Sequence, residues 1–201
     1  MTKGHKIIIG AFAAVGLIAL AAVLLPKLFH SNSDVPENSY DGYIRILNDL
    51  CPSDIIVYGE DIGFRSTLNY RVITEITEDS LTSDPKYKYS FFVINDRSGA
   101  LKITDDEFAL CKRIAEENNQ SFFYVGQQYF KKLKEFGFYD YLLTDPDNYH
   151  GVAYVISPFS PGHGMIHGFW MSSEEEHYLK NNELLGHILT LQFTDAIKRF
   201  R

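Results

Sequence analysis

Histidine and glutamate side chains near the end of the chain have the types and spacing that could bind a metal ion. His163 and His167 lie four residues apart within the stretch SPFSPGHGMIHGFW, and Glu174 and His177 follow as Glu-x-x-His. Two histidines four apart on a helix can bind one zinc ion, but the glycines around them disfavour a helix. In an extended chain they would lie about 13 Å apart. Di-iron helices need a second Glu-x-x-His motif, which the sequence lacks, so we expect no metal site.

The cysteines and the glycine motifs narrow the chemistry further. Cys51 and Cys111 are the only cysteines and form no Cys-x-x-Cys pair, which excludes a zinc knuckle. They could form a disulfide if the domain lies outside the cell, or be two separate buried thiols, which the position of Cys111 on an apolar helix face favours. The sequence has no Gly-x-Ser-x-Gly, Gly-x-Gly-x-x-Gly or Gly-Lys-Ser/Thr motif. We therefore expect no serine hydrolase, no dinucleotide or P-loop phosphate site, and no cofactor.

A long apolar segment near the start of the chain predicts a membrane anchor. Residues 7–25 contain no charged or strongly polar side chain, and as a helix they would span roughly 28 Å, close to the hydrocarbon thickness of a bilayer. A cleaved signal peptide is the alternative, but the apolar run continues past the small residues that could form a cleavage site. We expect a tail at 1–6, a transmembrane anchor at 7–25, a linker at 26–40 and one folded domain at 41–201.

The charge distribution predicts the location and the partners of this domain. Lys3, Lys6 and the N-terminal amine precede the anchor, so the positive-inside tendency predicts a cytoplasmic N-terminus and an extracytoplasmic domain in the cell membrane. Beyond Lys27 the chain has 16 Lys and Arg against 26 Asp and Glu, a net charge of −10. Such a surface repels nucleic acids. The expected partners are the lipid bilayer, through 7–25, and a protein that contacts the domain; the sequence gives no indication of an oligomeric state.

Alternating apolar runs and helical patterns predict the fold of the domain. Four runs have the composition of buried strands: 54–58, 89–94, 121–125 and 152–156. Helical patterns occupy 43–50, 66–76 (where β-branched residues leave a strand open), the segment after a Thr104-x-x-Glu107 capping box, 128–136 and 185–200. This alternation indicates an α/β domain of three layers, with a doubly wound and mainly parallel sheet of the flavodoxin-like type.

The residues that follow the predicted strands are the candidate ligand-binding side chains, because ligands of doubly wound sheets bind beyond the carboxyl ends of the strands. These residues are Glu60 and Asp61 after the first strand, Asp96 and Arg97 after the second, Gln127 after the third, and His163 in the loop after the fourth. The carboxylates could bind a cation or a sugar hydroxyl. Polar turns without a ligand are the alternative.

Three segments of the domain follow one another in the order found in a known family. The first is GFRS at 63–66, after a strand and a glycine. The second runs from YSFFVIN at 89–95 through LKITDDE at 101–107 to FFYVG at 122–126, and the third joins GVAYVIS at 151–157 to GHG at 162–164. Together they resemble the trehalose-utilisation-type proteins of the class I glutamine amidotransferase-like superfamily. The resemblance covers most of residues 54–200 and implies a flavodoxin-like fold.

The same resemblance does not imply amidotransferase catalysis. Those enzymes use a cysteine at a sharp strand-to-helix turn, activated by a histidine and a carboxylate. The corresponding position here holds Gln127 and Gln128, and neither Cys51, before the first strand, nor Cys111, within a helix, can replace the missing cysteine. The family's histidine after the first strand is also absent.

We therefore expect a non-catalytic, membrane-anchored α/β domain that binds a protein partner or a small ligand at the cell envelope. The missing nucleophile and the missing cofactor motifs favour this hypothesis. One alternative is an enzyme that acts on a carbohydrate-like substrate through Glu60, Asp96 and His163. Another is an acidic, envelope-tethered inhibitor or immunity protein that masks a basic partner.

Overall fold

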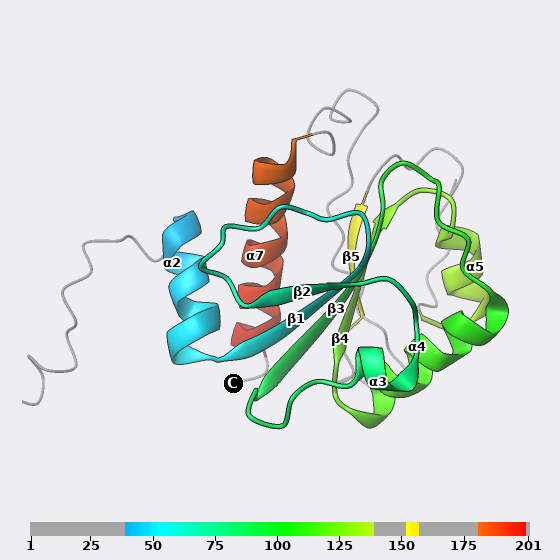
Figure 1. Ribbon diagram of the computed structural model, residues 1–201, viewed down its shortest axis with the longest axis horizontal. Coiled ribbons are helices and arrows are strands. Elements are labelled where there is room, and N and C mark those ends of the chain that lie inside the picture. The colour runs from blue at the N-terminus through cyan, green and yellow to red at the C-terminus, as the bar shows by residue number, and fades with distance from the viewer. Residues whose placement is uncertain (1–38, 139–151, 157–180, 200–201) are drawn as a thin grey trace, which may run out of the picture. The chain divides into compact units, whose positions relative to one another are not determined.

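A computed structural model of the chain describes residues 39–138, 152–156 and 181–199 (Figure 1). The chain divides into a unit at Met1–Pro36 and a unit at Glu37–Arg201, and every described residue belongs to the second. Within the described ranges, no helix is long and apolar enough to cross a membrane. The anchor predicted at 7–25 lies outside the described residues.

Five strands form one sheet, in the order β2-β1-β3-β4-β5. The strands are β1 (Ser53–Gly59), β2 (Tyr70–Ile73), β3 (Tyr89–Asp96), β4 (Ser121–Gly126) and β5 (Val152–Ile156). The first four are parallel: Val57 of β1 pairs with Val72 of β2 and with Val93 of β3, which in turn pairs with Phe123 of β4. The inner strands are apolar along their length because they are buried on both faces. The prediction of an α/β domain with a mainly parallel sheet is therefore confirmed.

The strand β5 runs antiparallel to β4, with Ile156 beside Phe122 and Val152 beside Gly126. The prediction of a fourth central strand at 152–156 is correct for the strand but wrong for its place and direction, since an apolar run carries no information on direction. The carboxyl end of β5 lies at the amino end of β4. The strand β5 therefore ends, at Ile156, at the end of the sheet opposite to the carboxyl ends of β1, β3 and β4.

Helices cover both faces of the sheet, which gives three layers (Figure 1). One face carries α2 (Tyr40–Arg45), the π-helical turn η1 (Ile46–Leu50) and α7 (Asn182–Arg199); the other carries α3 (Glu78–Leu81), α4 (Asp105–Glu117) and α5 (Phe130–Glu135). The helix α4 starts with the predicted capping box, in which the Thr104 hydroxyl accepts from the Glu107 N–H and the Glu107 carboxylate accepts from the Thr104 N–H.

A separate hydrophobic cluster lies on each face of the sheet, and neighbouring residues of each strand contribute to them in turn. Phe193 of α7 stacks on Phe91 at a ring-centroid distance of 4.6 Å and meets Phe123 edge-on at 4.8 Å. On the opposite face Phe122 packs against Phe138 at 4.7 Å. Because both faces are filled with large side chains, the strand ends are held in a fixed register.

The helical pattern at 66–76 does not form a helix. Its central residues are the strand β2, the alternative that their β-branched side chains left open. Four residues of β2 pair with β1, and this pairing outweighs the local spacing of apolar residues. The flanking residues Leu68 and Ile76 are buried in clusters on opposite faces of the sheet.

The two cysteines do not form the disulfide that the sequence left open. Cys51 is buried in the cluster beneath α7, and Cys111 is buried in the cluster beneath α4. The sheet lies between the two clusters, so the thiols are on opposite sides of it. Each cysteine therefore serves as a small apolar side chain of its own cluster.

Candidate functional site

The carboxyl ends of β1 and β3 lie side by side where the chain turns to opposite faces of the sheet. The segment after β1 passes over the face that α7 covers, where Ile62 and Phe64 are buried. The segment after β3 passes over the other face, where Ile103 is buried. Doubly wound sheets bind ligands at such a divergence, and we refer to this end of the sheet, at the carboxyl ends of β1, β3 and β4, as the crevice. The predicted residues that follow β1, β3 and β4 all come to this end of the sheet.

Two glycines let the strand ends approach one another closely. Gly59 has a φ of +100°, and a Cβ at this position would lie 2.4 Å from the carbonyl oxygen of Asn95. Gly126 has a φ of +154°, and a Cβ there would lie 2.6 Å from the hydroxyl oxygen of Tyr124. Only glycine tolerates both the positive φ and the close contact. The glycines predicted to close these strands thus shape the crevice itself.

An ion pair between Glu60 and Arg97 joins the ends of β1 and β3. Arg97 Nη2 lies 3.4 Å from Glu60 Oε2 and donates to the Asp61 carbonyl oxygen at 3.3 Å. Its Nη1 donates to Asn182 Oδ1 at 2.6 Å. The other carboxylate oxygen of Glu60 accepts from the Ser98 N–H at 3.2 Å. Arg97 therefore connects two strand ends to the start of α7.

Asp61 contacts the neighbouring strand β2 rather than the Glu60–Arg97 pair. Its Oδ1 accepts from the Gly63 N–H at 2.9 Å and from the Tyr70 hydroxyl at 3.2 Å. Burial, and next the negative charge of Asp61, raise the pKa of Tyr70. The Asp61 side chain thus fixes the turn after β1, while its backbone carbonyl belongs to the Arg97 contacts.

Asp96, the last residue of β3, is 1% exposed and accepts three hydrogen bonds. Its Oδ1 accepts from the Leu101 N–H at 3.0 Å. Its Oδ2 accepts from the Tyr124 hydroxyl at 3.1 Å and from Gln128 Nε2 at 2.6 Å. One carboxylate therefore ties the loop after β3 to β4 and to the turn that leads into α5.

Burial raises the pKa of Asp96 above its ordinary value, because the loss of hydration disfavours the charged form more than the three hydrogen bonds favour it. The nearby charge of Glu60 acts in the same direction. Burial, followed by the negative charge of Asp96, also raises the pKa of Tyr124. The Tyr124 hydroxyl therefore stays protonated at neutral pH and donates a hydrogen bond to the Asp96 carboxylate.

A hollow of about 410 Å³ opens beside Asp96, within the size range of small-molecule sites. One wall is the loop after β3, with Arg97, Ser98 and Gly99; the other is the segment after β4, with Gln127, Gln128, Phe130 and Lys131. Both glutamine side chains are exposed. Amide, hydroxyl and ammonium groups thus surround the hollow with hydrogen-bond donors and acceptors.

The sixth predicted residue, His163, lies outside the described residues. It was expected at this crevice because a parallel strand at 152–156 would have delivered the following loop there. Since β5 is antiparallel, that reason no longer holds. The segment after Ile156 starts from the other end of the sheet.

Sequence reasoning missed two residues that complete the site, Tyr124 and Asn182, and one contact, that of Gln128 with Asp96. Tyr124 was read as part of an apolar strand, although a tyrosine two residues before a strand-ending glycine is a signal for a hydroxyl near the strand end. Asn182 accepts a hydrogen bond from Arg97, which lies 85 positions earlier in the sequence, and no local sequence pattern predicts a contact over that separation. Gln128 stood next to a predicted residue, and its contact with Asp96 depends on the turn after Gly126.

Among the described residues, no serine or cysteine side chain at the crevice is hydrogen-bonded to a carboxylate or an imidazole. The turn after β4 has glutamines, and the nearest candidate thiol by sequence, Cys111, is buried within α4, where burial raises its pKa. The described ranges also hold no group of three His, Cys, Asp or Glu side chains that could bind a metal ion.

Comparison of the chain with protein-family models, with curated proteins and with solved structures gives no match.

Proposed function

We propose that this protein is a membrane-anchored, non-catalytic α/β domain that binds a small polar ligand or a protein partner at the cell envelope. The binding site is the hollow beside the carboxyl ends of β3 and β4. The anchor is residues 7–25, with the N-terminus in the cytoplasm and the domain outside. The strand order and the opposite paths after β1 and β3 support a flavodoxin-like sheet in which β5 is reversed.

The observation that carries this proposal is the engagement of both acidic side chains that could act in catalysis. Glu60 is paired with Arg97, and Asp96 accepts three hydrogen bonds from the protein itself. A general acid or base must reach the substrate with a lone pair or a proton. Groups held in this way instead build a fixed rim, around which exposed amides can contact a ligand.

The charge around the hollow favours a ligand of low net charge. Arg97 and Lys131 lie beside Asp96, and Glu60 balances Arg97, so the four charges cancel. The Gln128 amide donates to Asp96 and to the Leu101 carbonyl oxygen, so its own oxygen is the group that it can offer to a ligand, as an acceptor. A sugar, an amide or a zwitterionic amino acid matches these groups better than an anion or a cation does.

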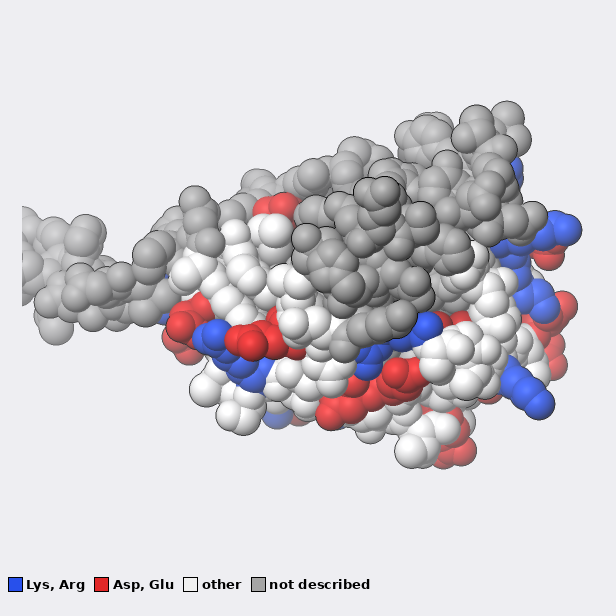
Figure 2. Space-filling view, turned by 90° about the horizontal axis from the view of Figure 1, so that it is seen from above, with Lys and Arg blue, Asp and Glu red and all other residues white. Residues whose placement is uncertain are grey.

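A protein partner would meet a surface of mixed charge. Figure 2 shows acidic and basic side chains next to one another over the described part of one face. No single-sign patch dominates that face, although the chain beyond Lys27 has a net charge of −10. A partner would thus be selected by hydrogen bonds and shape at the crevice more than by charge alone.

The proposal is tested by nuclear magnetic resonance of the full chain in a non-ionic detergent. The probe is N-acetylglucosamine, which has both hydroxyl and amide groups, with D-glucose and acetamide as its partial analogues. We expect backbone amide shifts at Ser98, Gly99, Gln127 and Gln128, reduced in Gln128→Ala and retained in the control Lys134→Ala. The ligand signals should stay unchanged over time.

Two results would contradict the proposal. If none of the three probes shifts these amides, the hollow is not a site for small polar ligands of this kind. If new ligand signals accumulate, and Asp96→Asn stops their appearance, the protein is an enzyme. The raised pKa of Asp96 is the specific observation that favours this alternative.

A further inference from the structure

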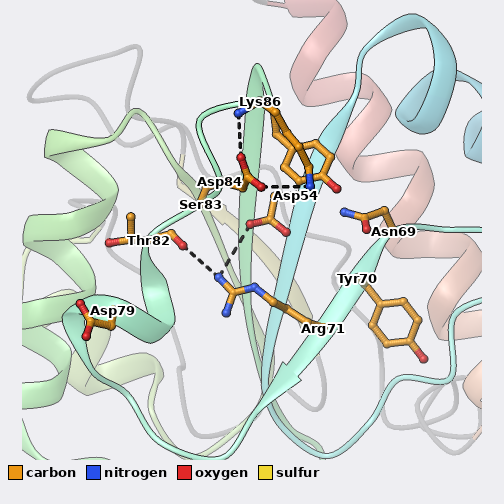
Figure 3. Close-up of a pocket in the computed structure, with 10 residues that line it drawn as sticks. Asp54, Asn69, Tyr70, Arg71, Asp79, Thr82, Ser83, Asp84 and Lys86 are labelled. Carbon is orange, nitrogen blue, oxygen red and sulfur yellow. Dashed lines mark hydrogen bonds and ion pairs between the residues drawn. The ribbon is translucent and has the colours of Figure 1, made fainter.

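A second and larger hollow, of about 600 Å³, lies away from the crevice, near the amino ends of β1 and β3 (Figure 3). Asp54, at the start of β1, and Arg71, on β2, form part of its wall. The segment between α3 and β3 supplies the rest, including Ser83, Asp84 and Tyr87. None of these residues belongs to the Asp96 site, so the two hollows are independent.

The buried Asp54 carboxylate at this hollow accepts no hydrogen bond from the residues that the structure describes. Its side chain is 6% exposed, and its closest cation is Arg71, whose Nη2 lies 3.7 Å from Asp54 Oδ2. That distance exceeds a hydrogen bond, and within the described parts of the chain no donor reaches either carboxylate oxygen. Neither oxygen is among the buried side-chain atoms without a partner, so the carboxylate keeps contact with the solvent in the hollow. The group is therefore poised to accept hydrogen bonds from something that enters the hollow.

Arg71 does not satisfy Asp54, because it is engaged with the backbone. Nη1 donates to the Ser80 carbonyl oxygen at 2.8 Å, and Nη2 donates to the Thr82 carbonyl oxygen at 3.0 Å. Figure 3 shows the bond to Thr82, just after α3, and the ion pair with Asp54. The guanidinium of Arg71 thus has hydrogen bonds to two backbone carbonyl oxygens and a longer ion pair with Asp54.

The one lysine that lines the hollow is likewise engaged elsewhere. Lys86 Nζ lies 2.9 Å from Asp84 Oδ2 and 4.7 Å from the centre of the Tyr87 ring. Both Lys86 and Asp84 are exposed. The lysine thus belongs to the rim, and its ammonium group is not the partner of Asp54.

A second polar atom in the hollow also lacks a partner. Ser83 Oγ is buried, and it has no hydrogen-bond partner among the described residues. Buried hydroxyls are normally hydrogen-bonded, so an orphan one calls for an explanation. An oxygen lone pair on Ser83 and two on Asp54 are the acceptors that a donor with several N–H groups requires.

The charged residues that line the hollow indicate whether its ligand is an anion, a neutral molecule or a cation. Asp54, Asp79 and Asp84 outnumber Arg71 and Lys86, so the hollow has an excess of one negative charge. An anion would be repelled by this excess negative charge, and a neutral ligand would leave the excess uncompensated. Tyr70 and Tyr87 also line the hollow, and aromatic rings favour cations.

We propose that this hollow binds a primary ammonium group, with Asp54 as its buried anionic partner and Ser83 Oγ as a further acceptor. The ammonium group belongs to a small amine or to a lysine side chain of a partner protein. Either source has three N–H donors at the end of a flexible apolar stem. The site is separate from the crevice at the other end of the sheet and serves a different ligand.

The test is a titration of the full chain, in a non-ionic detergent, with n-butylammonium chloride followed by backbone amide shifts. We expect shifts at Arg71, Ser83 and Tyr87, and none at Gln127 or Gln128. Asp54→Asn, which keeps the size of the side chain, should weaken binding by at least roughly tenfold, since it removes a charged hydrogen bond. The matched control Asp79→Asn changes an exposed carboxylate of the same hollow and should weaken binding far less.

Further titrations test whether the charge of the ligand is required and whether the ammonium group comes from a free amine or a lysine side chain. Neutral n-butanol should give no shifts, and sodium chloride at equal ionic strength should give none. Putrescine and an acetylated, amidated Gly-Lys-Gly peptide are then compared, and the tighter of the two identifies a free amine or a lysine side chain as the source. The proposal is overturned if wild type shows no shifts at the hollow, if Asp54→Asn binds as tightly as wild type, or if n-butanol binds equally well.

Discussion

An aspartate is buried at each end of the sheet, and the two differ in the hydrogen bonds that their carboxylates accept. At the carboxyl end, Asp96 accepts hydrogen bonds from Leu101, Tyr124 and Gln128. At the amino end, the one contact of the Asp54 carboxylate among the described residues is an ion pair of 3.7 Å with Arg71. Both carboxylates lie beside a hollow, so burial alone does not distinguish them.

This difference indicates that the Asp96 carboxylate stabilises the fold and that the Asp54 carboxylate is available to a ligand. A buried carboxylate with a full set of donors organises the chain around it, and the loss of its partners leaves several polar groups unsatisfied. A buried carboxylate without donors contributes little to stability and can even reduce it. We therefore expect Asp96 and Asp54 to respond differently to the same kinds of substitution.

The largest effect is expected for Asp96→Ala. The substitution leaves the Leu101 N–H and the Tyr124 hydroxyl without their acceptor, so we expect the free energy of unfolding to fall by about 3 kcal/mol. Urea unfolding of the full chain measures it. Asp49→Ala, at an exposed aspartate, is the control and should change stability by less than about 0.5 kcal/mol. Equal effects of the two would remove Asp96 from the framework of the fold.

A smaller loss is expected for Gly126→Ala, about 2 kcal/mol, because a Cβ would meet both Tyr124 and the backbone of Asp96 at a positive φ. Gly99→Ala is the matched control. Its φ is +67°, but nothing lies within 4 Å of its Cβ, so only the backbone strain of about 1 kcal/mol remains. Thermal unfolding compares the two, and a larger loss at Gly99 would contradict the close packing proposed at the strand ends.

The raised pKa of Asp96 predicts a pH dependence with a definite sign. The folded protein keeps the Asp96 proton at pH values where the unfolded chain has already lost it. Stability from this group is therefore present below the unfolded pKa, near 4, and is lost as pH rises through the folded pKa. The difference in unfolding free energy between wild type and Asp96→Asn should shift against wild type from pH 4 to pH 7. A shift in its favour would mean that the pKa is lowered.

The smallest effect is expected for Asp54→Asn, within about 1 kcal/mol of wild type in either direction. Arg71 keeps its two carbonyl acceptors in this variant, so the wall of the hollow should persist. Chemical unfolding without added amine gives the value. A loss above about 2 kcal/mol would identify Asp54 as a structural residue and weaken the contrast with Asp96.

Much of the fold follows from composition alone. The apolar runs at 54–58, 89–94 and 121–125 became buried parallel strands because such strands are covered on both faces. At 66–76 the favoured helix was wrong and the strand that the sequence left open was right, because pairing with β1 outweighs the helical spacing of the apolar residues. The direction of β5 was not predictable, since it depends on pairing with β4 and not on the residues of the run.

The site was predictable to the extent that it follows strand ends. Glu60 and Arg97 were predicted because residues that directly follow buried parallel strands lie at the carboxyl ends of those strands, where ligands bind. Asp54 was missed for the opposite reason: it opens a strand and was read as part of the apolar run. An aspartate inside such a run is nevertheless a signal, because a charge in a buried strand needs a partner.

A single sample of the full chain tests the central claim most directly, by recording amide shifts first with N-acetylglucosamine and then with n-butylammonium chloride. The account predicts that the first ligand shifts Ser98, Gln127 and Gln128 without being consumed, and that the second shifts Arg71, Ser83 and Tyr87. Shifts from both ligands at the same end of the sheet, or at neither end, would contradict it.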